Sequence, residues 1–144
     1  MSYGNGVQAY KQVRVNTASQ GELLIMLFDA AIRHMNRANE RILVRDYAST
    51  NAHLLKAQAI LNELMASLDF SVELARVLFR LYEYCHHELV NANVSKKNDG
   101  ILAALEIMSG LRAAWHQAIR EDAAQRSAVA VSQSRGRGGI EIAH

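Results

Sequence analysis

The chain has 144 residues, of which half are hydrophobic, and it contains one cysteine and no proline. This length and composition suit a single domain with one core. A lone cysteine excludes an internal disulfide and is typical of a cytosolic protein. No apolar run of about 18 residues is present, so we expect no transmembrane helix. The N-terminus lacks a charged region followed by an apolar stretch and a small-residue cleavage site, so we expect no signal peptide. The formal net charge of +2 argues against nucleic-acid binding, which normally needs a dense basic face.

The first predicted element is an N-terminal arm, residues 1–18, which we expect to be a mobile cap segment. It leads into the motif SQGE at residues 19–22, which fits a capping box. In that motif the serine and the glutamate three positions later satisfy each other's free backbone donors. A helix is therefore predicted to begin at residue 19.

Apolar residues then recur at spacings of three and four, the period of one helical face, through four segments. These segments cover residues 19–44, 47–68, 72–93 and 99–124, with Asp46 and Ser71 as the expected caps of the second and the third. The absence of proline and the abundance of Ala, Leu, Glu, Arg and Gln also favour helices. Because short links join the segments, consecutive helices must run antiparallel. The predicted fold is all-α, an antiparallel up-down-up-down four-helix bundle over residues 19–126.

The predicted core is one apolar stripe on each helix. In the second helix Tyr47, Leu54, Leu61 and Leu68 are spaced seven apart, with Ala57 and Leu64 at the intermediate positions. This seam is typical of helices that cross at a shallow angle. The other stripes are Leu24, Phe28, Ala31, Met35, Ala38 and Ile42; Ala75, Leu78, Tyr82, Cys85, Leu89 and Ala92; and Ile101, Leu105, Met108, Leu111, Trp115, Ala118 and Ile119. After Arg126 this period is lost, so residues 127–144 are expected to form a disordered tail.

A metal-dependent enzyme is the opposing hypothesis for such a bundle. The di-iron class needs two Glu-x-x-His motifs and two further glutamates that face inward. Only one such motif is present, with Glu83 and His86, and these two residues flank the predicted stripe. No nucleophilic constellation or glycine-rich phosphate loop can be recognised. We therefore expect no enzymatic activity, no metal and no cofactor.

Four arginines recur every four residues along the first predicted helix: Arg33, Arg37, Arg41 and Arg45. Like charges at this spacing destabilise a helix, so the stripe needs partners. Asp29 lies four residues before Arg33, and Glu40 lies three residues after Arg37. A solvated outer face is the favoured interpretation, and a docking surface for an acidic partner is the alternative.

The first predicted helix also begins with more apolar side chains than one core can use. Residues 23–28 read LLIMLF, and six successive positions cannot all face one side of a helix. The second helix has a similar excess, with Leu54 and Leu55, then Ala59, Ile60 and Leu61. One interpretation is burial beneath neighbouring helices and the N-terminal arm. The other is a hydrophobic groove that receives an amphipathic helix of another chain, covered by the arm until a partner displaces it.

Several segments have a recognisable order and spacing. They read AYKQVRVNTASQGELLIMLFDAAI from residue 9, AHLLKAQAILNEL from residue 52, then LYEY, ELVNAN and LRAAWHQAI. Together they resemble the FliS-type flagellin export chaperones, over about residues 8–122. Two departures are Gln20, where the family often has proline, and Ala30, where it often has glycine.

The resemblance implies a cytosolic, non-enzymatic chaperone. It would bind the disordered C-terminal segment of flagellin, prevent premature polymerisation and assist delivery to the flagellar type III export apparatus. Export-gate and regulatory flagellar proteins are further candidate partners, whereas nucleic acid and stable membrane insertion are not expected. A general helical adaptor for another secretion or regulatory partner is the alternative.

The same resemblance suggests which residues bind the partner. Tyr10 matches a tyrosine of the mobile N-terminal segment that is linked to the binding surface. Positions expected to contact the partner, or to support those contacts, are Leu23, Leu27, Lys56, Ile60 and Leu64. Tyr82, Asn93 and Trp115 match signature positions that we expect to fix the fold.

Overall fold

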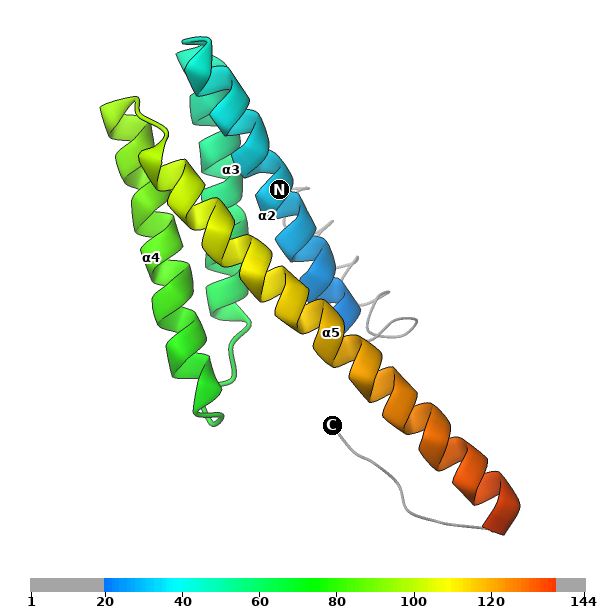
Figure 1. Ribbon diagram of the computed structural model, residues 1–144. Helices are drawn as coiled ribbons and strands as arrows, with labels where there is room; N and C mark the ends of the chain where they lie inside the picture. Colours follow the sequence, from blue (N-terminus) through cyan, green and yellow to red (C-terminus); the bar gives the residue numbers. More distant parts are fainter. Residues whose placement is uncertain (1–19, 137–144) are drawn as a thin grey trace, which may run out of the picture.

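The structure is a computed structural model that describes residues 20–136 (Figure 1). It contains the helices α2 (Gln20–Leu43), α3 (Tyr47–Ala66), α4 (Leu74–Ser95) and α5 (Asp99–Gly136), and no strand lies within these residues. Each helix packs against the next in the chain, and α5 returns to pack against α2. The predicted antiparallel four-helix bundle is therefore confirmed, and its helices form a closed ring around one core.

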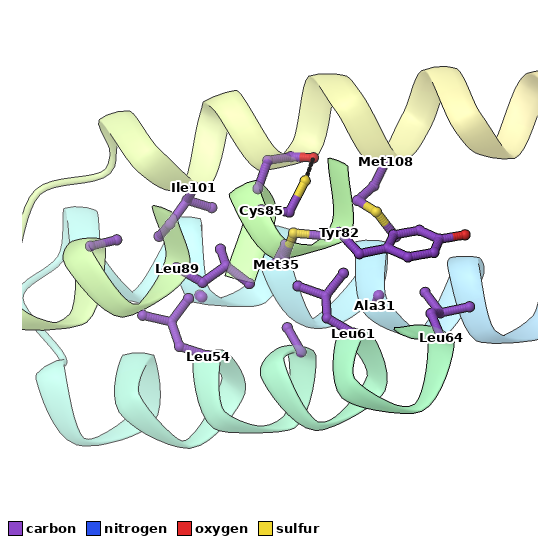
Figure 2. Close-up of a cluster of buried hydrophobic side chains, with 14 of the residues drawn as sticks. Ala31, Met35, Leu54, Leu61, Leu64, Tyr82, Cys85, Leu89, Ile101 and Met108 are labelled. Carbon is purple, nitrogen blue, oxygen red and sulfur yellow. Dashed lines mark hydrogen bonds between the residues drawn. The ribbon is translucent and has the colours of Figure 1, made fainter. Parts of the chain in front are cut away.

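The core consists of one stripe from each helix, but the predicted stripe of α5 reaches the core only in its first half. Ile101, Ala104 and Met108 are buried there, whereas Ala118 is exposed. All six predicted residues of α4 are buried, from Ala75 to Ala92, and in α2 all predicted residues except Leu24 are buried. Figure 2 shows buried side chains from all four helices gathered between the ribbons. Burying each large aliphatic side chain contributes about 1.5–3 kcal/mol, so this contiguous core is the main source of stability.

The stripe of α3 departs from the prediction at its first residue. Tyr47 is exposed, and the fully buried residue of the first turn is Thr50. The Thr50 hydroxyl donates a hydrogen bond to the Asp46 carbonyl at 2.9 Å. This internal partner makes the burial of a polar side chain tolerable, so a threonine fills a position that hydrophobicity alone does not mark.

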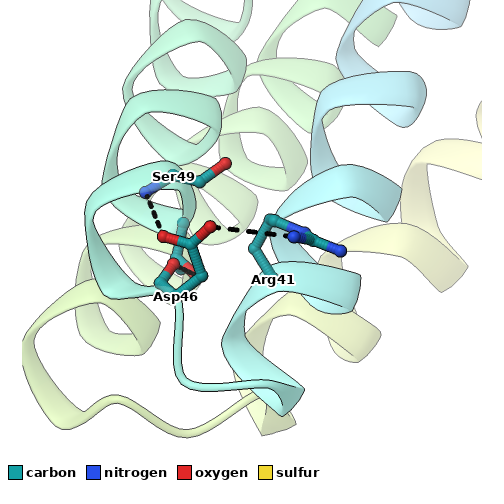
Figure 3. Close-up of polar contacts among 4 residues, drawn as sticks. Arg41, Asp46 and Ser49 are labelled. Atoms are coloured by element: carbon teal, nitrogen blue, oxygen red, sulfur yellow. Dashed lines mark hydrogen bonds and ion pairs between the residues drawn. The ribbon is translucent and has the colours of Figure 1, made fainter.

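The turn between α2 and α3 is fixed by Asp46, the predicted cap (Figure 3). Its Oδ1 accepts a hydrogen bond from the Ser49 backbone N–H at 3.2 Å. Its Oδ2 lies 3.7 Å from Nη1 of Arg41 on α2. One carboxylate thus satisfies an orphan donor of α3 and links that helix to the end of its neighbour.

The predicted cap at Ser71 is wrong. Its hydroxyl and backbone N–H donate to the Asp69 carboxylate at 2.7 and 3.0 Å, and these two bonds lower the pKa of Asp69. Ser71 therefore stabilises a turn before α4, and the helix begins at Leu74. At its other end α4 runs to Ser95 and stops where Lys96 adopts a left-handed conformation, with φ 60°.

The helix α5 is longer than predicted and extends beyond the other three (Figure 1). Residues 127–136, expected to belong to a disordered tail, continue the helix to Gly136. They contain Ala, Val, Gln and Ser, with neither proline nor glycine before Gly136, and extending an existing helix avoids the cost of a new nucleus. Among residues 20–136 no other helix lies beside this end of α5 (Figure 1), so an apolar stripe is not needed there. The expected arm at 1–18, the Ser19 cap and the tail at 137–144 lie outside the described residues.

Two glycines of α5 should respond oppositely to a methyl group. A Cβ on Gly100 would overlap the backbone carbonyl of Glu88 on α4, whereas a Cβ on Gly110 would meet no atom within 4 Å. Gly100→Ala should therefore lower the free energy of unfolding by about 1–3 kcal/mol. Gly110→Ala should raise it by about 0.5–1 kcal/mol, because alanine loses less backbone entropy in a helix. Urea unfolding measures both, and changes of the same sign would contradict this account.

Candidate binding surface

The apolar block at the start of α2 is only partly enclosed by the bundle. Phe28 is fully buried, and its ring centroid lies 6.4 Å from that of Tyr82. Leu24 and Leu27 pack against the rim of the core but keep part of their surface exposed. Met26 is 41% exposed. The first turns of α2 thus present apolar surface on more than the core-facing side.

The predicted contact positions of α2 and α3 line up along the seam between these helices. His34 and His53 meet across this seam, with their Nδ1 atoms 3.0 Å apart, and their contact marks the register of the antiparallel pair. Leu27 lies two turns before His34 on α2, and Ile60 lies two turns after His53 on α3. Because the two helices are antiparallel, Leu27 and Ile60 lie level with each other. One further turn brings Leu23 level with Leu64. Residues that the sequence separates by more than thirty positions therefore share one strip.

The outcome differs among the predicted site residues. Leu23 and Leu27 are half-buried, Lys56 is exposed, and Ile60 packs against the core while part of it remains accessible. Leu64 is fully buried, so it is placed to support the strip from below and not to touch a partner. Tyr10 lies outside the described residues.

A groove opens beside this strip, between α2 and α3. It is lined by His34, Leu55, Lys56, Ala59 and Ile60, and Leu55 is 52% exposed. Lys56 and Ile60 therefore belong to one concave surface. His34, Leu55 and Ala59 are not among the predicted contact positions, although Leu55 and Ala59 belong to the apolar excess of this helix.

A second apolar region lies where α2 begins and α5 leaves the bundle. Leu24 and Trp115 line two hollows there, one along α5 and one beside the link between α3 and α4. Val72 and Leu74 line the latter hollow and are both more than half exposed. Trp115 packs against the core, as expected for a fold-fixing residue, and also faces these hollows. The sequence signal for Val72 and Leu74 was the unusually apolar link between α3 and α4, since most helix connections are polar.

The charges near the groove are distributed differently from the expectation. Asp29, the expected partner of Arg33, instead pairs with Arg112 of α5, with Oδ1 and Nε 2.5 Å apart. Arg41 pairs with Asp46. Between residues 20 and 136, no carboxylate forms an ion pair with the remaining cations beside the groove, Arg33, Arg37 and Lys56.

These cations surround the His34–His53 pair, whose rings are half-buried and 5.3 Å apart. Burial lowers the pKa of His34 and His53, and the neighbouring positive charges of Lys56 and Arg37 lower both further. The two Nδ1 atoms make one hydrogen bond, which requires one ring to donate and the other to accept. The geometry therefore favours a pair that is not doubly protonated at neutral pH.

The described part of the chain offers neither a metal-binding cluster nor a reactive thiol. No cluster of three or more His, Cys, Asp or Glu side chains that would hold a metal ion occurs there. Burial raises the pKa of the Cys85 thiol to about 12, and its Sγ lies 4.0 Å from the Ala104 carbonyl oxygen (Figure 2). A thiol in such surroundings is not a nucleophile at neutral pH. None of the described helices is both long and apolar enough to cross a bilayer.

The family model for the flagellar protein FliS matches residues 3–122. The chain belongs to the FliS family. It is 36% identical to the flagellar secretion chaperone FliS of Bacillus subtilis (strain 168), over 88% of this chain and 95% of that protein. It is 33% identical to the flagellar secretion chaperone FliS of Salmonella typhimurium (strain LT2), over 81% of this chain and 92% of that one.

A solved structure gives independent support for the fold. The crystal structure of a bacterial flagellar chaperone superposes with a TM-score of 0.68 at 19% sequence identity, covering 81% of this chain and 98% of that one. Membership of the FliS family makes the chain a flagellar secretion chaperone and not an enzyme, as the sequence predicted.

The histidine pair predicts a loss of stability in mild acid. The folded pKa values of His34 and His53 lie below the ordinary value of 6.5, so the unfolded chain binds protons more readily. This contribution to stability is fully present above pH 6.5 and is lost as the pH falls through 6.5 to the folded values. The double variant His34→Gln/His53→Gln should lose less stability between about pH 8 and about pH 5 than the parent chain. Urea unfolding at both pH values measures this, and identical losses in the two proteins would contradict it.

Proposed function

We propose that this chain is a cytoplasmic chaperone that holds the C-terminal segment of flagellin and keeps it from polymerising before export. The observation that carries the proposal is the partly exposed apolar strip along α2 and α3, which continues beyond a core that is already complete. In a family of flagellar secretion chaperones, such a strip suits an amphipathic helix supplied by the exported subunit.

The physical logic is that of folding coupled to binding. A segment that assembles through helical contacts has an apolar stripe, and covering that stripe blocks assembly. Ordering the segment on the chaperone offsets part of the gross contact energy. The complex is therefore firm enough to protect the subunit and still weak enough to release it at the type III export apparatus.

Named residues have different roles in this proposal. Leu23, Leu27 and Ile60 provide the apolar floor of the seam, Lys56 provides charge at its edge, and Leu64 supports them from the core. Tyr10 is proposed to act from the N-terminal segment, where it would help cover the strip in the absence of flagellin.

Co-purification tests the proposed cargo. Full-length flagellin should be captured by this chain, and a flagellin that lacks only its C-terminal segment should not. The isolated segment should also bind and become helical, which circular dichroism detects. If the folded chaperone captures neither the full-length protein nor the segment, the chain serves another partner, and the role of a general helical adaptor takes its place.

A charge placed in the groove should weaken capture. Leu55→Asp and Ile60→Asp each place a carboxylate against the bound segment, where burying it without a partner is costly. We expect the affinity for the flagellin segment to fall by about tenfold or more, as measured by isothermal titration calorimetry. Val94→Asp is the matched control, because Val94 is 79% exposed in the last turn of α4.

The control should leave the affinity unchanged. Helicity and urea unfolding are measured for all three variants, since Ile60 also contacts the core and its replacement costs some stability. Leu55 is largely exposed, so Leu55→Asp separates binding from folding. Wild-type affinity in the folded Leu55→Asp variant would remove the α2–α3 groove from the binding site.

A further inference from the structure

We propose that the groove between α2 and α3 selects an acidic helix: an amphipathic segment that carries carboxylates one turn apart beside its apolar stripe. The inference rests on the proposed function only for the source of this helix, which we take to be the captured flagellin segment. Beyond the proposed function, we infer that the cargo is acidic at this site and that its binding is coupled to proton uptake.

The first observation is a set of cations without acidic partners. Arg33 and Arg37 lie one turn apart on α2, Lys56 faces them from α3, and all three are exposed. Within residues 20–136 none of them forms an ion pair with a carboxylate. Like charges one turn apart repel each other, so incoming carboxylates with the same spacing relieve this repulsion and form charge-assisted hydrogen bonds.

The second observation is the apolar wall that adjoins these cations. Leu55, Ala59 and Ile60 line the same groove as Lys56 and His34. A helix docked there would turn an apolar stripe toward α3 and an acidic edge toward α2. A purely apolar ligand would leave the three cations unpaired, and a basic ligand would be repelled. The arrangement therefore discriminates by charge among helices of equal hydrophobicity.

The third observation is the His34–His53 pair at the edge of this surface. The charged groups that act on it are Arg33, Arg37, Arg41 and Glu40 from α2 and Lys56 from α3. Only Glu40 favours protonation, and the cations oppose it. Carboxylates on a docked helix reverse this balance and raise the pKa of the imidazoles. Binding should then take up protons and become tighter as the pH falls.

Three synthetic helical peptides test the charge selection. They share one apolar stripe and carry, at two edge positions one turn apart, either Glu, Gln or Lys. Titration calorimetry with the full chain should show the Glu peptide binding about threefold to tenfold more tightly than the Gln peptide, as two partly exposed ion pairs would give, and the Lys peptide binding most weakly. The advantage of the Glu peptide should shrink in high salt.

The chain offers a matched pair of charge variants. Arg33→Gln/Arg37→Gln should abolish the preference for the Glu peptide. Arg76→Gln/Arg80→Gln removes two exposed arginines with the same spacing from α4, the helix diagonal to α2 in the ring, and should leave the preference intact. Equal affinity for the Glu and Gln peptides in the parent chain, or equal effects of the two double variants, would overturn the proposal.

Proton uptake is measured by titrating the Glu peptide in buffers of different ionisation enthalpy near pH 6 and near pH 8. We expect uptake and tighter binding near pH 6, and the loss of both in His34→Gln/His53→Gln. Stronger binding near pH 8 would overturn the proton link.

Parallel titrations with the flagellin segment separate this inference from the proposed function. If the segment binds but is insensitive to Arg33→Gln/Arg37→Gln, the charge selection fails and the proposed cargo stands. If the Glu peptide binds selectively and the flagellin segment does not bind, the cargo fails and the acidic-helix site stands.

Discussion

The interior of the bundle has room for only one apolar stripe from each helix. This limit determines which apolar side chains remain at the surface. Such a stripe covers roughly 100° of a helix. The six core residues of α4 keep within it, from Ala75 to Ala92. The six successive apolar residues that open α2 do not, and only Phe28 among them is fully enclosed. What remains is apolar surface at the edge of a finished core, on which the proposed chaperone activity depends.

The composition of the binding strip is set by the register of α2 and α3. Asp46 caps α3 and pairs with Arg41 of α2, so the short turn holds both helices at a defined level. This register places His34 against His53 and carries Leu27 to the level of Ile60. A capping interaction at one end of the bundle thus determines which side chains share a groove several turns away.

The α2–α5 contact, which closes the ring of helices, also determines which charged residues of α2 are paired. Asp29 pairs with Arg112 across the α2–α5 contact, and an exposed pair of this kind contributes little to stability. Its larger consequence is for Arg33, the residue one turn further along α2, which is left without this local acidic partner. The contact between α2 and α5 therefore helps to leave the outer α2–α3 face basic, next to the apolar wall formed by Leu55 and Ile60.

The sequence by itself determined the four helices, their antiparallel order and nearly all of the core, because hydrophobic period and link length are local properties. The order of its segments also indicated the FliS family. Only the tertiary structure decided that Trp115 faces two hollows and that Asp29 pairs with Arg112. Each of these depends on which distant segments approach one another. The expectation of a disordered tail was wrong at residues 127–136, since the continuation of an existing helix needs no apolar stripe.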